Sequence, residues 1–187
     1  RRQLIDTHTS QARGQLNLIK AIGSDAMMAL TVIAHEIKSA GGSSEYVNRV
    51  GDYVEWVRKT DPAVVVAQTD VKGDRALRPH EQDDPDMYVR IVEERADGIV
   101  VRGAKAHTTS SVTANEIIVP PTRAMGERDR DYAVAFAVPA NAKGLKLLCR
   151  PMPSIEVSAF DNPISRHNLE VETVTVFDDV FVPADRS

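Results

Sequence analysis

Residues 55–70, EWVRKTDPAVVVAQTD, contain the point at which the sequence changes from a helical to a β pattern. Before Asp61-Pro62, apolar residues recur three or four positions apart, which is typical of an amphipathic helix. After it, β-branched residues come in short runs, beginning at 64–66. Because the residue before a proline avoids the α region, the helical part ends at Asp61. We therefore expect a domain boundary here, between residues 1–61 and 62–187.

The helical part is expected to form a hairpin, with helices over residues 15–40 and 44–59. Gly41-Gly42 can supply the left-handed stop of the first helix. Ser43 or Ser44 can cap the second helix through its hydroxyl group.

The β part is expected to contain about seven short strands separated by turn residues. The runs are 64–66, 87–94, 99–101, 116–119, 132–138, 145–148 and 171–177. Asp97-Gly98 predicts a hairpin turn, since both residue types tolerate positive φ. Asn141, Lys143 and Gly144 predict a second turn. The fold class is therefore α+β, a helical hairpin followed by an all-β, barrel-like domain.

Composition narrows the function classes. The chain of 187 residues has 42% hydrophobic and 27% charged residues, and its apolar runs are far shorter than a membrane span needs. No nucleic-acid footprint is expected, because the net charge of −4 is spread along the chain. The lone Cys149 can form no internal disulfide and cannot by itself hold a metal or cluster. We expect a cytoplasmic excerpt of a longer protein, with a small molecule as its partner and no metal site.

The loop after the first β run is the first candidate site. Its cations, hydroxyl group and glycine amides suit the carbonyls and phosphates of a dinucleotide. The candidate residues are Gln68, Thr69, Asp70, Lys72, Gly73 and Arg75. The alternative is a solvated loop with internal Asp–Lys and Asp–Arg pairs.

Two further segments carry polar groups that could serve chemistry. His107, Thr108 and Thr109 end a strand, and hydroxyl groups there can point at a ring such as flavin. The alternative is a β-bulge at Gly103 with hydroxyl groups that satisfy the loop backbone. Glu172 begins the last strand and could act as a base if its face lines a cleft, or it could face solvent.

Several motifs, in order, resemble one enzyme family. They are the run 69–75, Arg78-Pro79, the run 84–89, the run 97–107 and the run 177–183. From about residue 21 to the end, the chain is similar to the 4-hydroxyphenylacetate 3-hydroxylase and 4-hydroxybutyryl-CoA dehydratase family, closest to the dehydratase branch.

The resemblance implies an acyl-CoA dehydrogenase-like architecture whose C-terminal helical bundle this chain lacks, with residues 62–187 as the middle, FAD-binding β-barrel. Carried over by position, loop 68–75 and His107 to Thr109 contact the flavin, and Glu172 matches a possible catalytic carboxylate. A homotetramer is also implied for the full-length enzyme, and the excerpt alone is expected to be inactive.

Two departures separate the chain from both branches. The cysteines that bind a [4Fe–4S] cluster in the dehydratase branch are replaced by residues 17–22, NLIKAI. The Arg and Tyr that bind a phenol in the hydroxylase branch are replaced by Ser24 and Met27 or Met28. Three hypotheses result. The first is a flavin-dependent oxidoreductase of this family, acting with or without a separate flavin reductase. The second is a cluster-free dehydratase or isomerase acting on an acyl-CoA, and the third is a flavin-binding module without turnover.

Overall fold

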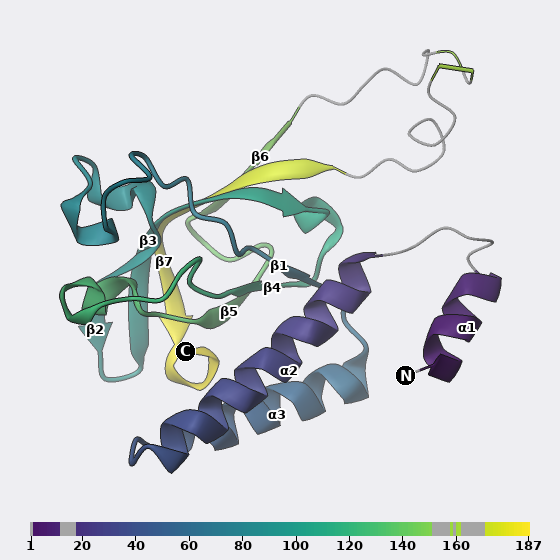
Figure 1. Cartoon of the computed structure of the whole chain (residues 1–187), viewed down its shortest axis with the longest axis horizontal. Helices are drawn as coiled ribbons and strands as arrows, with labels where there is room; N and C mark the ends of the chain where they lie inside the picture. The colour runs from purple at the N-terminus through teal and green to yellow at the C-terminus, as the bar shows by residue number, and fades with distance from the viewer. Residues whose placement is uncertain (1, 12–17, 151–157, 159, 162–170) are drawn as a thin grey trace.

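The computed structural model describes residues 2–11, 18–150, 158, 160–161 and 171–187 (Figure 1). The helices are α1 (Arg2–Gln11), α2 (Leu18–Ser39) and α3 (Glu45–Thr60). The predicted hairpin is confirmed, because α2 and α3 pack side by side and run in opposite directions (Figure 1). Its predicted start at residue 15 lies outside the described residues. None of the described helices is long and apolar enough to cross a membrane.

The residues predicted to end the first helix and to begin and end the second one do so, but Asp61 differs in its backbone conformation from the prediction. Gly41 has φ 87°, and its amide donates to the carbonyl of Lys38. Ser43, rather than Ser44, provides the side-chain cap, because its Oγ accepts from the amide of Glu45 at 3.1 Å. Asp61 ends α3 with φ 47°, so it is left-handed instead of extended as its position before proline predicts.

In the described part of the chain, seven strands follow the helices, as predicted. They are β1 (Val64–Val66), β2 (Arg90–Arg95), β3 (Gly98–Thr109), β4 (Glu116–Val119), β5 (Phe136–Pro139), β6 (Leu145–Cys149) and β7 (Glu172–Pro183). β3 and β7 are much longer than their apolar runs indicate, and β5 is shorter because residues 127–132 form 3₁₀ turns.

The strands form two sheets. One has the order β1-β4-β5 and the other has the order β2-β3-β7-β6. A closed barrel is not confirmed, because no ladder connects the two sheets among the described residues. The described strands therefore form two separate sheets.

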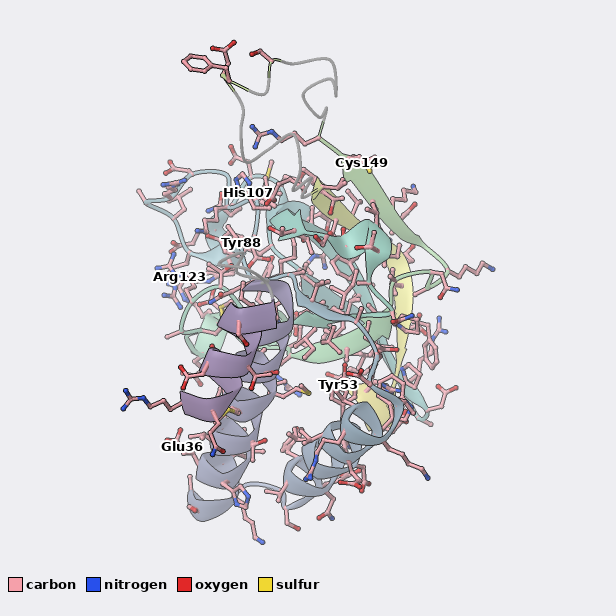
Figure 2. The ribbon with its side chains drawn as sticks, turned by 90° about the vertical axis from the view of Figure 1, so that its right-hand side faces the viewer. Glu36, Tyr53, Tyr88, His107, Arg123 and Cys149 are labelled. Carbon is pink, nitrogen blue, oxygen red and sulfur yellow. The ribbon has the colours of Figure 1, made fainter. Side chains whose placement is uncertain are left out.

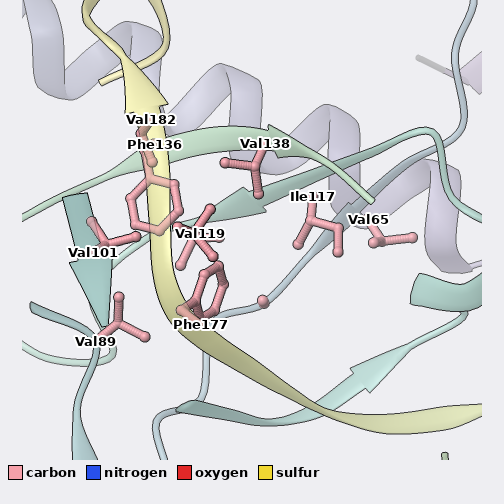
Figure 3. Close-up of a cluster of buried hydrophobic side chains, with 11 residues drawn as sticks. Val65, Val89, Val101, Ile117, Val119, Phe136, Val138, Phe177 and Val182 are labelled. Atoms are coloured by element: carbon pink, nitrogen blue, oxygen red, sulfur yellow. The ribbon is translucent and has the colours of Figure 1, made fainter. Parts of the chain in front are cut away.

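The three-stranded sheet is buried on both faces, which explains its continuous apolar runs. Ile117 and Phe136 face the four-stranded sheet in the main core, where the ring of Phe136 meets that of Phe177 edge to face at 5.6 Å (Figure 3). Ile118 faces the helices instead, in a second cluster with Tyr53 of α3. The sheet thus forms the middle layer between the hairpin and the second sheet.

Two backbone features shape β3. The β2–β3 hairpin is confirmed, but its loop residues are Ala96 and Asp97, one position before the predicted pair, and neither Asp97 nor Gly98 has positive φ. Gly103 has φ 132° and lies beside a register shift, but the extra residue is on β7, because the step from Val101 to Gly103 opposes the longer step from Val180 to Phe177. A Cβ at Gly103 would lie 2.5 Å from the carbonyl oxygen of Tyr88, so only glycine fits without strain.

Candidate functional site

Loop 68–75 lies beside the second half of β3. The amide of Ala106 donates to the carbonyl of Thr69 at 2.7 Å, and Asp70 forms a β-bridge with Lys105. β2 pairs with the first half of the same strand, so the loop continues that edge of the sheet. This pairing places loop 68–75 next to the strand that ends in His107, Thr108 and Thr109.

The predicted ion pairs inside the loop do not form. Among the described residues, neither Lys72 nor Arg75 has a carboxylate within ion-pair distance. Asp74 instead accepts from the amide of Ala76, and Asp70 points into the protein. Lys72 and Gly73 both have positive φ, at 77° and 50°. The loop therefore presents two cations that are not neutralised by its own acids.

Asp70 differs from the other predicted loop residues because it is buried. Its Oδ2 accepts from Lys105 Nζ at 2.8 Å, and its Oδ1 accepts from the amide of Val89 at 3.0 Å. Gln68 is exposed and Thr69 is half-buried. The Asp70 carboxylate thus contacts other parts of this chain, whereas Lys72 is half-buried and Arg75 is exposed.

Thr109 and Glu172 are brought together by strand pairing, although 63 positions separate them in sequence. They are register partners in β3 and β7, and Thr109 Oγ1 donates to Glu172 Oε1. Glu172 Oε2 is buried without a hydrogen-bond partner among the described residues. Neither side chain is fully buried, and Glu170, the predicted companion of Glu172, lies outside the described residues.

Thr108 points to the opposite side, into a buried cluster of four hydroxyl groups. The cluster consists of Thr108, Ser111, Thr173 and Thr175, each no more than 2% exposed. Thr175 Oγ1 donates to Thr108 Oγ1 at 2.9 Å, and the Ser111 and Thr173 oxygens are 2.7 Å apart. Thr108 is therefore an interior residue. Its burial follows from the bulge at His107, which is exposed with φ 59°.

A second buried carboxylate was missed from the sequence. Asp129 is fully buried and accepts hydrogen bonds from the Arg78 guanidinium, the His80 imidazole and the amide of Gly126. Burial alone would raise the pKa of Asp129, but these hydrogen bonds hold it far below its usual value. Arg78-Pro79 was noted only as a motif. Its partner lies 51 positions away, so local sequence could not show it.

A large groove lies elsewhere. It has a volume of about 670 Å³ and lies between α2, α3 and the segment that leads into β5. Tyr53 and Leu30 contribute to its largely apolar wall, but none of the predicted site residues lines it. In Figure 2, Tyr53 on the hairpin is well separated from His107. Groove size alone would thus have pointed away from the predicted segments.

Comparison with known proteins identifies relatives of two kinds. Residues 1–186 match the family model described as 4-hydroxyphenylacetate 3-hydroxylase N terminal. The 4-hydroxybutyryl-CoA dehydratase/vinylacetyl-CoA-Δ-isomerase of Clostridium aminobutyricum is 42% identical over 172 residues, which are 89% of this chain and 35% of that protein. The chain therefore spans about a third of the length of that relative.

Solved structures of both kinds share this fold. An oxygen-tolerant archaeal 4-hydroxybutyryl-CoA dehydratase from N. maritimus superimposes with a TM-score of 0.81 at 35% identity, covering 88% of this chain and 33% of that one. The oxygenase component of 4-hydroxyphenylacetate 3-monooxygenase, solved in complex with FAD, has a TM-score of 0.69 at 32% identity and covers 86% and 33%.

Proposed function

Because the chain belongs to the 4-hydroxyphenylacetate 3-hydroxylase family, we propose that the complete protein is a flavin-dependent oxidoreductase that binds FAD. Residues 62–187 supply one wall of the flavin site, and residues 1–61 end a helical domain. The change from α3 to β1 between Thr60 and Val64 supports this division. The similar monooxygenase that was solved with FAD supports the choice of cofactor.

The observation that carries the proposal is the pair of cations in loop 68–75 that have no carboxylate partner. Lys72 and Arg75 are the groups that would hold the diphosphate of FAD, since charge-assisted hydrogen bonds to phosphate are strong. The residues present therefore fit an anionic cofactor.

Thr109 is the residue that we place toward the flavin ring. Its single proton goes to Glu172, so its oxygen keeps lone pairs that can accept a hydrogen bond from a ligand. The buried, unpartnered Oε2 of Glu172 is a second acceptor beside it. When bound, FAD would supply the redox chemistry, while these two side chains orient the ligand and hold a proton at Glu172.

A lyase is the second candidate. The 42% identity to a dehydratase and isomerase favours an acyl-CoA substrate, with Glu172 as the base. For the hydroxylase candidate, the substrate would be a phenolic acid. A separate flavin reductase would be its partner, since the similar monooxygenase is named an oxygenase component. A flavin-binding module without turnover is the third candidate. A cytoplasmic location, a homotetramer and closure of a β-barrel stay predictions.

Absorption spectra of the complete protein, as purified and after FAD titration, test the proposal. Flavin bands alone fit the oxidoreductase and a lyase without a cluster, an added broad iron–sulfur shoulder would contradict the loss of the cluster cysteines, and no binding of added FAD contradicts all three candidates. Turnover assays with phenolic acids and acyl-CoA esters then separate an enzyme from a module.

Matched variants then locate the binding site. Lys72→Met and Arg75→Met should each raise the Kd for FAD about 10- to 100-fold, as expected for a lost hydrogen bond to a charged group worth about 1.5–3 kcal/mol. Lys146→Met is the control, because Lys146 is also an exposed cation but is paired with Asp178. Equal Kd values for all three variants would place the phosphates elsewhere.

A further inference from the structure

We propose that Lys105 is a positioning residue, whose buried ammonium group fixes the start of loop 68–75 in the shape that binds FAD. This inference rests on the proposed function, and it assigns a role to a residue that does not itself contact the cofactor. Asp70, predicted as a flavin contact, becomes part of this internal support.

The contacts of Lys105 Nζ connect three segments. It donates to Asp70 Oδ2 at 2.8 Å, to the carbonyl of Gln68 at 3.0 Å and to the carbonyl of Pro120 at 2.9 Å. These acceptors use all three donors of an ammonium group. Lys105 is only 1% exposed, so water cannot substitute for any of them. One side chain on β3 thereby joins loop 68–75 to the segment after β4.

Thr122 holds the same residues from the other side. Its Oγ1 donates to the carbonyl of Gln68 at 2.6 Å and accepts from the amide of Asp70 at 2.7 Å. The carbonyl of Gln68 therefore receives two donors, from Lys105 and from Thr122. Together with the bond from Val89 to Asp70, these contacts fix the backbone over residues 68–70. Lys72 follows two positions after Asp70. The placement of the Lys72 and Arg75 side chains therefore depends on how these contacts hold the backbone of residues 68–70.

Stability alone is a weak reason for such an arrangement. Burial lowers the pKa of Lys105 because it disfavours the charged form, although Asp70 opposes that shift. Keeping the ammonium group charged in the interior therefore costs free energy. Buried ion pairs can often be replaced by neutral side chains with little loss of stability. A neutral replacement would no longer connect Gln68 to Pro120, however. The positions of these carbonyls are what the lysine determines.

The first test uses the complete protein and compares Lys105→Met with the double variant Lys105→Met/Asp70→Asn. The single variant leaves the Asp70 carboxylate buried without its cation, and should lose both stability and FAD affinity. The double variant removes that charge and should regain much of the stability. We expect its Kd for FAD, measured by fluorescence titration, to stay at least about tenfold above that of the wild type.

The second test changes no charge. Thr122→Val removes the hydroxyl group that bridges Gln68 and Asp70, and should raise the Kd for FAD about tenfold with a small loss of stability. Thr122→Ser restores the hydroxyl group and should restore binding. Thr113→Val is the control, because the Thr113 hydroxyl donates to the nearby carbonyl of Ser110 and to no other group in the described part of the chain. This series decides the question even if the Lys105 variants fail to fold.

The outcomes separate this inference from the proposed function. If the double variant and Thr122→Val bind FAD as tightly as the wild type does, FAD affinity changes only where stability is lost. That result would overturn the positioning role and leave the proposed function intact. A wild-type protein that binds no added FAD would overturn both. Weakened binding in a stable double variant, with rescue by Thr122→Ser, supports the role of Lys105.

Discussion

Asp129→Asn should destabilise the protein strongly, because it removes a buried charge that accepts hydrogen bonds from Arg78 and His80. The variant keeps the shape of the side chain, but one oxygen that accepts from Arg78 or His80 becomes an NH₂ group. Breaking a fully buried ion pair in this way costs about 3–5 kcal/mol. The Arg78 side chain is 32% exposed, so water can partly replace its lost partner. We therefore expect a loss of about 2–3 kcal/mol in the free energy of unfolding.

Urea unfolding followed by circular dichroism measures this loss. Asp131→Asn is the matched control, because Asp131 lies in the same 3₁₀ segment but is exposed, and it should change stability by less than about 0.5 kcal/mol. A loss for Asp129→Asn no larger than that of the control would refute the idea that Asp129 holds residues 78–80 in place.

The pH dependence provides a second measurement on the same variant. The pKa of Asp129 is lower in the folded than in the unfolded chain, so its stabilisation is complete above the unfolded value of about 3.9. It is lost as the pH falls from there through the folded pKa. Below about pH 4, the unfolding free energy of the wild type should therefore decrease more steeply than that of Asp129→Asn. Parallel slopes would contradict the assigned hydrogen bonds.

The remaining predictions concern the two long strands. Thr108→Val should cost about 1–3 kcal/mol in urea unfolding, because the Thr175 hydroxyl loses its acceptor in a dry cluster. Thr109→Val should lose less stability and should change FAD affinity or the flavin reduction potential; equal stability losses with unchanged flavin properties would remove Thr109 from the site. Gly103→Ala should destabilise the protein by about 1–3 kcal/mol, because of the positive φ at this position and the close contact with Tyr88. Gly51→Ala, on an open helix surface, is the control and should be neutral or stabilising. Similar shifts of the melting temperature for both variants would refute the idea of strain at Gly103.

Local pattern was sufficient for the order of the elements after α1, a helix that was not predicted. The hairpin, its end at Asp61 and the seven strands each depend on residues within about one turn or one run of the chain. The cations of loop 68–75 were also visible locally, as were Thr109 and Glu172 as separate candidates. What local pattern could not supply was which of these groups lie together, because pairing depends on register between distant strands.

The tertiary structure decided the lengths of β3 and β7, and it decided which of their polar side chains are buried and which are exposed. Lys105, Thr108 and Thr175 have polar side chains, yet each is buried, and a partner from elsewhere in the chain satisfies it. Lys105 depends on Asp70, 35 positions away, and a short apolar run gives no sign of that contact. Sequence by itself therefore determined the elements and the family resemblance. Only the folded chain determined which polar groups face a ligand and which support the fold, because a buried charge is stable only where distant segments meet it.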